Sequence, residues 1–287
     1  MTRGEFALFQ ALVLSEAGIW LADAKQALLV TRLTRRVREL GLPSFRSYHE
    51  FVEAHRDAEL PRMLDLVCTN ETHFFREAQH WDLLESAVFP RWEAEAAAGL
   101  RPHHIRAWCA ACSTGEEPFS LAMVLHRRFA AQGWSVDVLA SDLSTRVLAA
   151  AMEATWPVQR ASEIPPPLLR RYMLRGTGSQ EGRMRATRQL RALVRFERVN
   201  LSRAPLPVQG PFDLLLCRNV LIYFRPDDKL AVIRRLLPHL APAGLLLLGH
   251  AESLQATDLD IVTVAPTVYQ RPSHAARAAT GREADPQ

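Results

Sequence analysis

Residues 106–122 read RAWCAACSTGEEPFSLA, in which a short apolar run passes through small residues into a helical pattern. A buried strand followed directly by a helix is typical of open α/β sheets, which bind ligands beyond the carboxyl ends of their strands. The small side chains of 110–115 let the backbone approach a ligand, and the helix amino end offers free N–H groups. The single glycine does not match the Gly-x-Gly-x-x-Gly template, so the stretch predicts a ligand-binding turn without specifying a dinucleotide.

The chain after this turn continues to alternate between strand and helix patterns. Expected strands cover 105–110, 136–140, 193–199, 212–217, 244–249, 261–264 and 267–271, and expected helices cover 116–131, 145–154 and 228–240. This alternation predicts a largely parallel sheet with helices on both faces. The two closely spaced late strands suggest an antiparallel ending.

The chain before the sheet is expected to be helical, with helices at 28–40, 51–67 and 81–98. We therefore expect a helical domain over 1–88 and an α/β domain over 89–272. Three consecutive prolines and RGTGSQEG (175–182) interrupt the alternation, which predicts a small hairpin-like insertion at about 170–193. Residues 273–287 lack large apolar side chains and are expected to be disordered.

The composition is that of an ordinary globular protein, since 48% of the 287 residues are hydrophobic and 23% are charged. The net charge of +4 neither requires nor excludes nucleic acid. Charged residues interrupt the apolar amino end, unlike a signal peptide, and the longest apolar runs are too short to span a bilayer. We therefore expect a soluble, intracellular protein.

The four cysteines do not suggest a disulfide framework in a chain of this length. Cys109 and Cys112 have the Cys-x-x-Cys spacing of zinc and redox sites. Zinc needs two further ligands, and Cys68 and Cys217 are isolated residues. A redox pair normally opens a helix, whereas Cys109 ends an expected strand, so packing of a turn is the favoured role.

Two glutamates begin the helix after the first strand. Ser113 with Glu116, and Thr114 with Glu117, both have the spacing of a capping box. Capping therefore explains one glutamate, and the other is free to bind a cationic group such as an amino-acid ammonium.

Polar residues also follow the second and fourth strands. Asp142 ends the second strand, where an acid can accept hydrogen bonds from both ribose hydroxyls. The local alternative is that Asp142 or Ser144 only caps the next helix. Arg218 and Asn219 follow the fourth strand, and Tyr223 lies one helical turn beyond Asn219. These positions, taken with the first turn, favour a nucleotide- or nucleoside-binding domain.

The segment TNETHFFRE (69–77) stands out within the helical region. Asn70, Thr72 and Arg76 are spaced for one side of a turn that enters a helix, with the two phenylalanines as anchors. The local alternative is an ordinary helix cap at Asn70 or Thr72.

The combination of segments resembles the CheR-type chemotaxis receptor methyltransferases. The matching segments, in chain order, are TNETHFFRE, RAWCAACSTGEEPFSLA, LASDLSTRVL, FDLLLCRNVLIYF and GLLLLGHAESL, with RGTGSQEG and VYQRP as lesser matches. The match covers about 65–272. Ser144 stands where an acid is usual, and Phe119 where tyrosine is usual. The resemblance implies an α/β, Rossmann-like class I S-adenosylmethionine-dependent methyltransferase fold, with an N-terminal all-α domain and a small inserted β-subdomain.

The resemblance further implies methyl transfer from S-adenosylmethionine to glutamate carboxylates of methyl-accepting chemotaxis receptors. The products would be glutamate methyl esters, which serve receptor adaptation, and S-adenosylhomocysteine. The partners would be the cytoplasmic domains of these receptors, with a receptor C-terminal tail peptide bound by the inserted subdomain in some members. We expect a cytoplasmic monomer without a metal ion, a nucleic-acid partner or membrane insertion.

Site residues follow from position within the matched motifs. Implied cofactor contacts are Asn70, Thr72, Arg76, Gly115, Glu116, Glu117, Asp142, Asn200, Leu201, Arg218 and Asn219. By resemblance, Glu117 holds the amino-acid part and Asp142 the ribose. The residues near 200 and 218 contact the adenine side. Arg76 and Tyr223 are the residues placed nearest the methyl group and the accepting carboxylate.

Methyl transfer from a sulfonium to a glutamate needs no general base, because the carboxylate is already ionised at pH 7. The expected tasks are alignment and removal of water. We expect Arg76 to orient the carboxylate and Tyr223 to fix it by a hydrogen bond.

The helix around 24–40 carries a set of basic residues, namely Lys25, Arg32, Arg35, Arg36 and Arg38. A solvated basic face and a docking surface for an acidic helical substrate both remain open.

Two other functions are compatible with parts of this pattern. One is a non-catalytic adaptor of the same fold that binds S-adenosylmethionine or S-adenosylhomocysteine. The other, a nucleic-acid methyltransferase, is less favoured because no aromatic motif for a flipped base is apparent.

Overall fold

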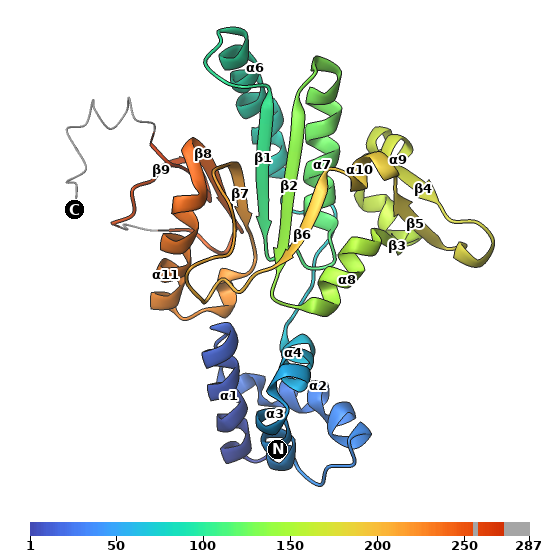
Figure 1. Cartoon of the computed structure of the whole chain (residues 1–287), viewed down its shortest axis with the longest axis vertical. Coiled ribbons are helices and arrows are strands. Elements are labelled where there is room, and N and C mark those ends of the chain that lie inside the picture. Colours follow the sequence, from blue (N-terminus) through green and yellow to red (C-terminus); the bar gives the residue numbers. More distant parts are fainter. Residues whose placement is uncertain (255–257, 273–287) are drawn as a thin grey trace.

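The computed structural model describes residues 1–254 and 258–272, so the tail at 273–287 that is expected to be disordered lies outside the described residues. A seven-stranded sheet forms the centre of the larger domain, in the order β6-β2-β1-β7-β8-β10-β9. The first helices of the chain lie together beyond the ends of the central strands, and a smaller group of strands projects to one side (Figure 1).

Five neighbouring strands of the sheet run parallel to one another. They are β1 (His104–Ala110), β2 (Ser135–Asp142), β6 (Val194–Arg198), β7 (Phe212–Cys217) and β8 (Leu240–Leu248). Two short strands, β10 (Val268–Gln270) and β9 (Val262–Ala265), complete the sheet in antiparallel pairing. The expected antiparallel ending is therefore confirmed. The carboxyl ends of β1 and β2 point toward the N-terminal helices (Figure 1).

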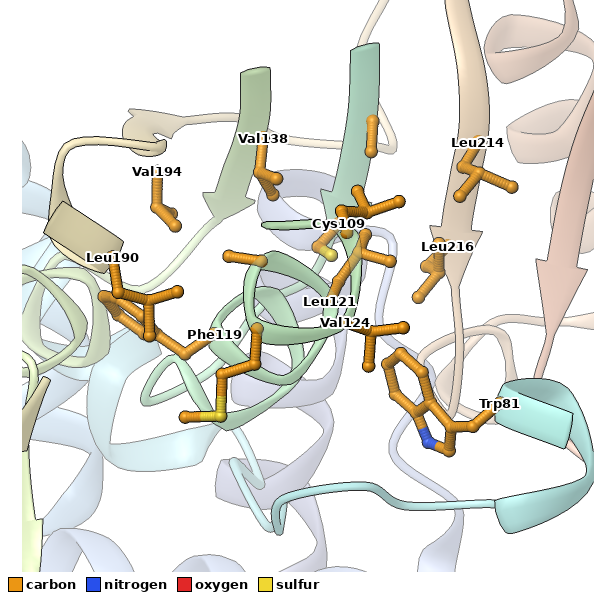
Figure 2. Close-up of a cluster of buried hydrophobic side chains, with 14 of the residues drawn as sticks. Trp81, Cys109, Phe119, Leu121, Val124, Val138, Leu190, Val194, Leu214 and Leu216 are labelled. Carbon is orange, nitrogen blue, oxygen red and sulfur yellow. The ribbon is translucent and has the colours of Figure 1, made fainter. Parts of the chain in front are cut away.

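One face of the sheet is covered by α7 (Glu116–Phe129). Phe119 and Leu121 of this helix share a buried cluster with Cys109 of β1 and Leu214 of β7, and Trp81 lies at its edge (Figure 2). Side chains alternate along a strand, so the neighbouring residues of the same strands face the opposite side. The buried, largely apolar side chains of β1 fit the expectation of a strand covered on both faces.

The opposite face packs against α11 (Pro226–Leu236), where Val232 and Ile233 join Trp108, Leu215 and Leu246 of the strands in a second cluster. Apart from the helices of the insertion, the remaining helix between strands of the sheet is α8 (Thr145–Glu153). Single turns of 3-10 helix occur at η3 (Ala130–Gln132), η6 (Leu221–Tyr223) and η7 (Leu237–His239).

The N-terminal domain has a hydrophobic core of its own that runs from Phe6 to Val67. Its helices are α1 (Arg3–Ala17), η1 (Asp23–Lys25), α2 (Gln26–Glu39), α3 (Phe45–Ala54) and α4 (Arg56–Val67). The expected single helix at 51–67 is wrong: two helices meet at His55, whose φ of −126° and ψ of 42° leave the helical region. Helical periodicity continues across the break and does not reveal it.

The expected helix at 81–98 is divided into α5 (Ala78–Leu83), a π-helical turn η2 (Leu84–Val88) and α6 (Phe89–Ala97). Trp81, Leu84 and Phe89 pack in the same cluster as the sheet and α7, not in the N-terminal core. The change of core therefore lies just after Val67, earlier than the expected boundary at 88.

The insertion is a three-stranded antiparallel sheet in the order β3-β5-β4. It comprises β3 (Thr155–Pro157), η4 (Val158–Glu163), α9 (Pro166–Tyr172), β4 (Met173–Arg175), η5 (Gly178–Gln180), β5 (Arg183–Ala186) and α10 (Arg188–Arg191). The insertion begins earlier than the expected 170–193. The sequence does not reveal this start, because β3 has three residues and is too short to show an alternating pattern. In the described ranges, no helix combines the length and apolarity that crossing a membrane requires.

Candidate functional site

One cavity is lined both by residues that follow the central strands and by residues of the N-terminal domain. Its wall therefore combines both domains. The lining residues include Trp20, Lys25, Leu28, Arg32, Thr69, Asn70, Thr72, Arg76, Ser113, Glu117, Asp142, Leu201, Arg218, Asn219 and Tyr223.

The turn after β1 approaches the cavity closely. Gly115 has a φ of 97°, and a Cβ at this position would lie 3.1 Å from the Cβ of Ala151, so glycine suits both the conformation and the space. Helix α7 begins at Glu116 without a capping side chain, so the capping-box interpretation is wrong. The Ser113 hydroxyl instead donates to the Asn70 carbonyl oxygen at 2.8 Å, and this contact links the turn to the loop at 68–77.

The end of β2 presents Asp142 to the cavity. Its Oδ2 accepts from the Ser113 N–H at 2.9 Å and its Oδ1 from the Ser144 N–H at 3.0 Å, so the carboxylate is held in one orientation. Burial raises the pKa of Asp142, and these N–H groups act in the opposite direction. The Ser144 hydroxyl caps α8 by accepting from the Val147 N–H at 3.3 Å. Ser144 is therefore the cap, and Asp142 is available to accept from hydroxyl groups of a ligand.

Arg218 connects two parts of the site that are distant in sequence. Its guanidinium Nε donates to Glu117 Oε2 at 2.6 Å, and its Nη1 donates to the Arg76 carbonyl oxygen at 2.8 Å. The Arg218 side chain is 1% exposed. Within the described residues, Arg218 Nη2 and Asn70 Nδ2 are buried donors without a hydrogen-bond partner. Unpaired donors in a cavity wall favour a ligand that carries acceptor groups.

The loop at 68–77 does not start a helix at Asn70 or Thr72, so the capping alternative for these residues is wrong. Phe74 is buried and packs edge-to-face against Trp156 of the insertion at 5.0 Å between ring centroids. Arg160 Nη1 donates to the Thr72 carbonyl oxygen at 2.8 Å, and Glu163 Oε2 accepts from the Phe74 N–H at 2.9 Å. The insertion therefore fixes the loop that carries Arg76.

Tyr223 lines the cavity together with Arg76, although the two residues lie in different halves of the sequence. Burial raises the pKa of Tyr223, while a hydrogen bond with Thr69 and the positive charges of Arg32 and Arg76 act the other way. The phenol thus remains protonated at neutral pH and can donate a hydrogen bond. The Trp20 N–H donates to the Tyr223 carbonyl oxygen at 2.8 Å and so ties this segment to the N-terminal domain.

Three of the expected cofactor contacts do not line the cavity: Gly115, Glu116 and Asn200. Glu116 is buried and accepts from the Thr114 hydroxyl at 2.6 Å. The Asn200 amide donates to the Glu16 carbonyl oxygen at 2.7 Å, so its side chain fixes the segment that presents Leu201 to the cavity.

The basic residues of α2 have different surroundings. Arg32 lines the cavity and donates to the Val67 carbonyl oxygen and the Thr69 hydroxyl. Arg36 donates two hydrogen bonds to the buried Glu59, at 2.6 and 2.8 Å. Its guanidinium is therefore engaged within the N-terminal domain. Of the four arginines on this helix, Arg35 and Arg38 are the exposed ones.

Trp20 and Leu28 also line the cavity, although they are absent from the expected set of site residues. The only feature of the sequence that could have indicated them is their apolar character beside basic residues.

The four cysteines are free, and Cys109, Cys112 and Cys217 are buried. Burial raises the pKa of each of these three thiols well above its usual range, which disfavours the reactive thiolate. These observations fit the packing role for Cys109 and Cys112.

Two family models match the chain. A model described as "CheR methyltransferase, all-alpha domain" matches residues 4–68, and "CheR methyltransferase, SAM binding domain" matches 70–269. The chain is 36% identical to "Chemotaxis protein methyltransferase 2" of Pseudomonas aeruginosa over 269 residues, which covers 93% of each chain. It is 39% identical to the "Chemotaxis protein methyltransferase" of Salmonella typhimurium over 259 residues, or 90% of this chain and 86% of the relative. The Escherichia coli relative of the same description is 36% identical over 270 residues, 94% and 91% respectively.

Proposed function

Because this chain belongs to the CheR methyltransferase family, it is an S-adenosylmethionine-dependent methyltransferase, and we propose that it methylates glutamate side chains on chemoreceptors. The supporting observation is that Arg76 and Tyr223 line the same cavity as Asp142 and Glu117. Groups suited to a substrate carboxylate are thus adjacent to groups suited to the cofactor. The proposed acceptors lie on the cytoplasmic domains of the receptors.

The residues of the cavity fit S-adenosylmethionine chemically. The Asp142 carboxylate suits the two ribose hydroxyls, and the Glu117 carboxylate suits the ammonium of the amino-acid part. The unpaired donors of Asn70 and Arg218 suit acceptor atoms such as the carboxylate oxygens of the same part. The bound cofactor supplies an electrophilic methyl group on a sulfonium centre.

The remaining task of the protein is to present the glutamate. The carboxylate is ionised at neutral pH, so no base is needed, and the attacking oxygen must lose water and align with the methyl group. Arg76 attracts and orients the carboxylate, and the protonated Tyr223 donates a hydrogen bond to the oxygen that does not attack. Arg76 is partly exposed, which limits how strongly it neutralises the nucleophile.

The test combines cofactor titration with methyl transfer. The chain should bind S-adenosylhomocysteine and transfer labelled methyl to a receptor cytoplasmic fragment, and mild alkali should release the label as expected for a carboxyl ester. Arg76→Ala should lower transfer at least tenfold, whereas the control Arg3→Ala, an exposed arginine of α1, should not. Cofactor binding without transfer to any receptor fragment would instead support a signalling adaptor, and alkali-stable label would indicate another acceptor.

We further propose that Arg35 and Arg38, with Lys25 at the cavity mouth, form the surface that docks an acidic receptor helix. Arg35 has a side chain that is 89% exposed, and Lys25 is exposed while lining the cavity. Charge reversal of both arginines to glutamate should raise KM for the receptor fragment several-fold, because electrostatic attraction assists encounter and orientation. Affinity for S-adenosylhomocysteine should not change. An unchanged KM at low ionic strength would contradict the docking role.

A further inference from the structure

Glu77 lies at the end of the loop at 68–77 and has no role in the site described so far. Its backbone φ of 61° and ψ of 71° is a left-handed conformation that glutamate rarely adopts. Its side chain is 8% exposed, so a charged group is largely withdrawn from water. A strained, buried charge of this kind persists only when its surroundings fix it.

The carboxylate of Glu77 contacts three separate segments. Oε1 accepts from Asn219 Nδ2 at 3.2 Å and from the His250 N–H at 3.1 Å. Oε2 lies 3.5 Å from Arg218 Nη1 and 3.3 Å from His80 Nδ1. Glu77 therefore joins its own loop to the segments that follow β7 and β8.

His80 lies beside Glu77 and also contacts Arg218. Its Nδ1 lies 3.2 Å from Arg218 Nη1, and its Nε2 lies 3.0 Å from the Thr267 hydroxyl. Glu77 and His80 thus both contact Nη1 of Arg218. The Nε of the same guanidinium donates to Glu117.

Glu77, His80 and His250 also have ligand atoms close enough together to hold a metal ion. The contact between Arg218 Nη1 and His80 Nδ1 makes that unfavourable, because the ring nitrogen facing the cluster already accepts from the guanidinium. A metal ion there would also lie against the guanidinium charge. The cation of this cluster is therefore Arg218 itself.

We propose that Glu77 is a positioning residue for cofactor binding, which holds Arg218 and Asn219 so that Glu117 and the unpaired Arg218 Nη2 face the cofactor. Glu77 acts through these residues, since it does not line the cavity itself. The inference rests on the proposed cofactor site, and it does not depend on which carboxylate accepts the methyl group.

The first experiment is calorimetric titration of S-adenosylhomocysteine into the full chain and Glu77→Gln. The amide retains the size and one acceptor but loses the charge opposite Arg218, so the affinity should fall on the order of tenfold. The matched control is Asp82→Asn, the same change at an exposed residue of α5, which should keep wild-type affinity. Glu77→Asp keeps the charge and should recover part of the loss.

The second experiment is a double-mutant cycle with Arg218→Met. If Glu77 acts through Arg218, Glu77→Gln should have little further effect on affinity in that background. Additive losses would overturn the proposal, as would wild-type affinity in Glu77→Gln accompanied only by a lower Tm. If Glu77→Gln does not fold, the cycle is run with Glu77→Asp. Failure of the wild-type chain to bind S-adenosylhomocysteine would count against the proposed function instead.

Discussion

His80 should make the stability of this protein depend on pH in a window where most carboxylates remain ionised. The side chain is 3% exposed, and burial, together with the charge of Arg218, lowers the pKa of His80 to about 4, with Glu77 acting in the opposite direction. An unfolded chain restores a value near 6.5. Between these values the unfolded state binds a proton that the folded state does not, so stability decreases as pH falls from 6.5 toward 4.

The size of this effect follows from the two pKa values. Relative to neutral pH, His80 lowers the free energy of unfolding by about 2 kcal/mol at pH 5. This loss approaches about 3 kcal/mol below pH 4, since each pKa unit corresponds to about 1.4 kcal/mol. The assay is urea unfolding of wild type and His80→Gln between pH 7.5 and 5. The variant is expected to be less stable at pH 7.5, because it loses a buried hydrogen-bonded ring, and this deficit should shrink by about 2 kcal/mol at pH 5.

The difference between the two proteins separates the effect of His80 from that of the other histidines with a lowered pKa. Burial also lowers the pKa of His126 and His239, and both residues are present in wild type and variant, so their contributions cancel. A stability difference that stays constant from pH 7.5 to 5 would refute the reasoning, because it would mean that the folded chain protonates His80 as readily as the unfolded chain does.

Three further outcomes are expected. Arg36→Met should lower the free energy of unfolding by about 3 kcal/mol in urea titration, because it leaves the buried Glu59 carboxylate without its ion-pair partner. Arg160→Met should weaken S-adenosylhomocysteine binding about threefold by calorimetry, because it removes the hydrogen bond to the Thr72 carbonyl oxygen and so frees the loop at 68–77. Cys109, Cys112 and Cys217 should react with a thiol reagent only after unfolding, so that at least three of the four thiol equivalents appear with the urea transition; reaction of these three thiols in the native state would contradict their burial.

Strands β1, β7 and β8 of the α/β domain were predictable from the sequence because each contains a short, bounded apolar run. The expected strand at 212–217 coincides with β7, and the expected helix at 116–131 differs from α7 by two residues. The insertion and the domain boundary were less predictable. Apolar periodicity predicts a helix at 81–98 with one buried face, but it does not show which of two cores that face joins.

The direction of individual side chains explains the remaining differences between the predicted and the observed site residues. Asn200 follows a strand as a ligand contact would, yet its amide turns toward the Glu16 carbonyl oxygen in a distant helix, which no local pattern indicates. On α2, in contrast, the signal was present. Leu33 and Val37 form the buried stripe, and Arg32 and Arg36 border it one turn apart, so helical geometry alone distinguishes them from the exposed arginines.

The N-terminal domain supplies one wall of the cavity through Trp20, Leu28 and Arg32, so a ligand that fills the cavity contacts both domains. Such a ligand binds the docked arrangement in preference to one in which the domains have separated, and by mass action it stabilises docking by about 2.7 kcal/mol at one hundred times its Kd. A higher concentration of the methyl donor would thereby raise the fraction of the protein in which the two domains are docked.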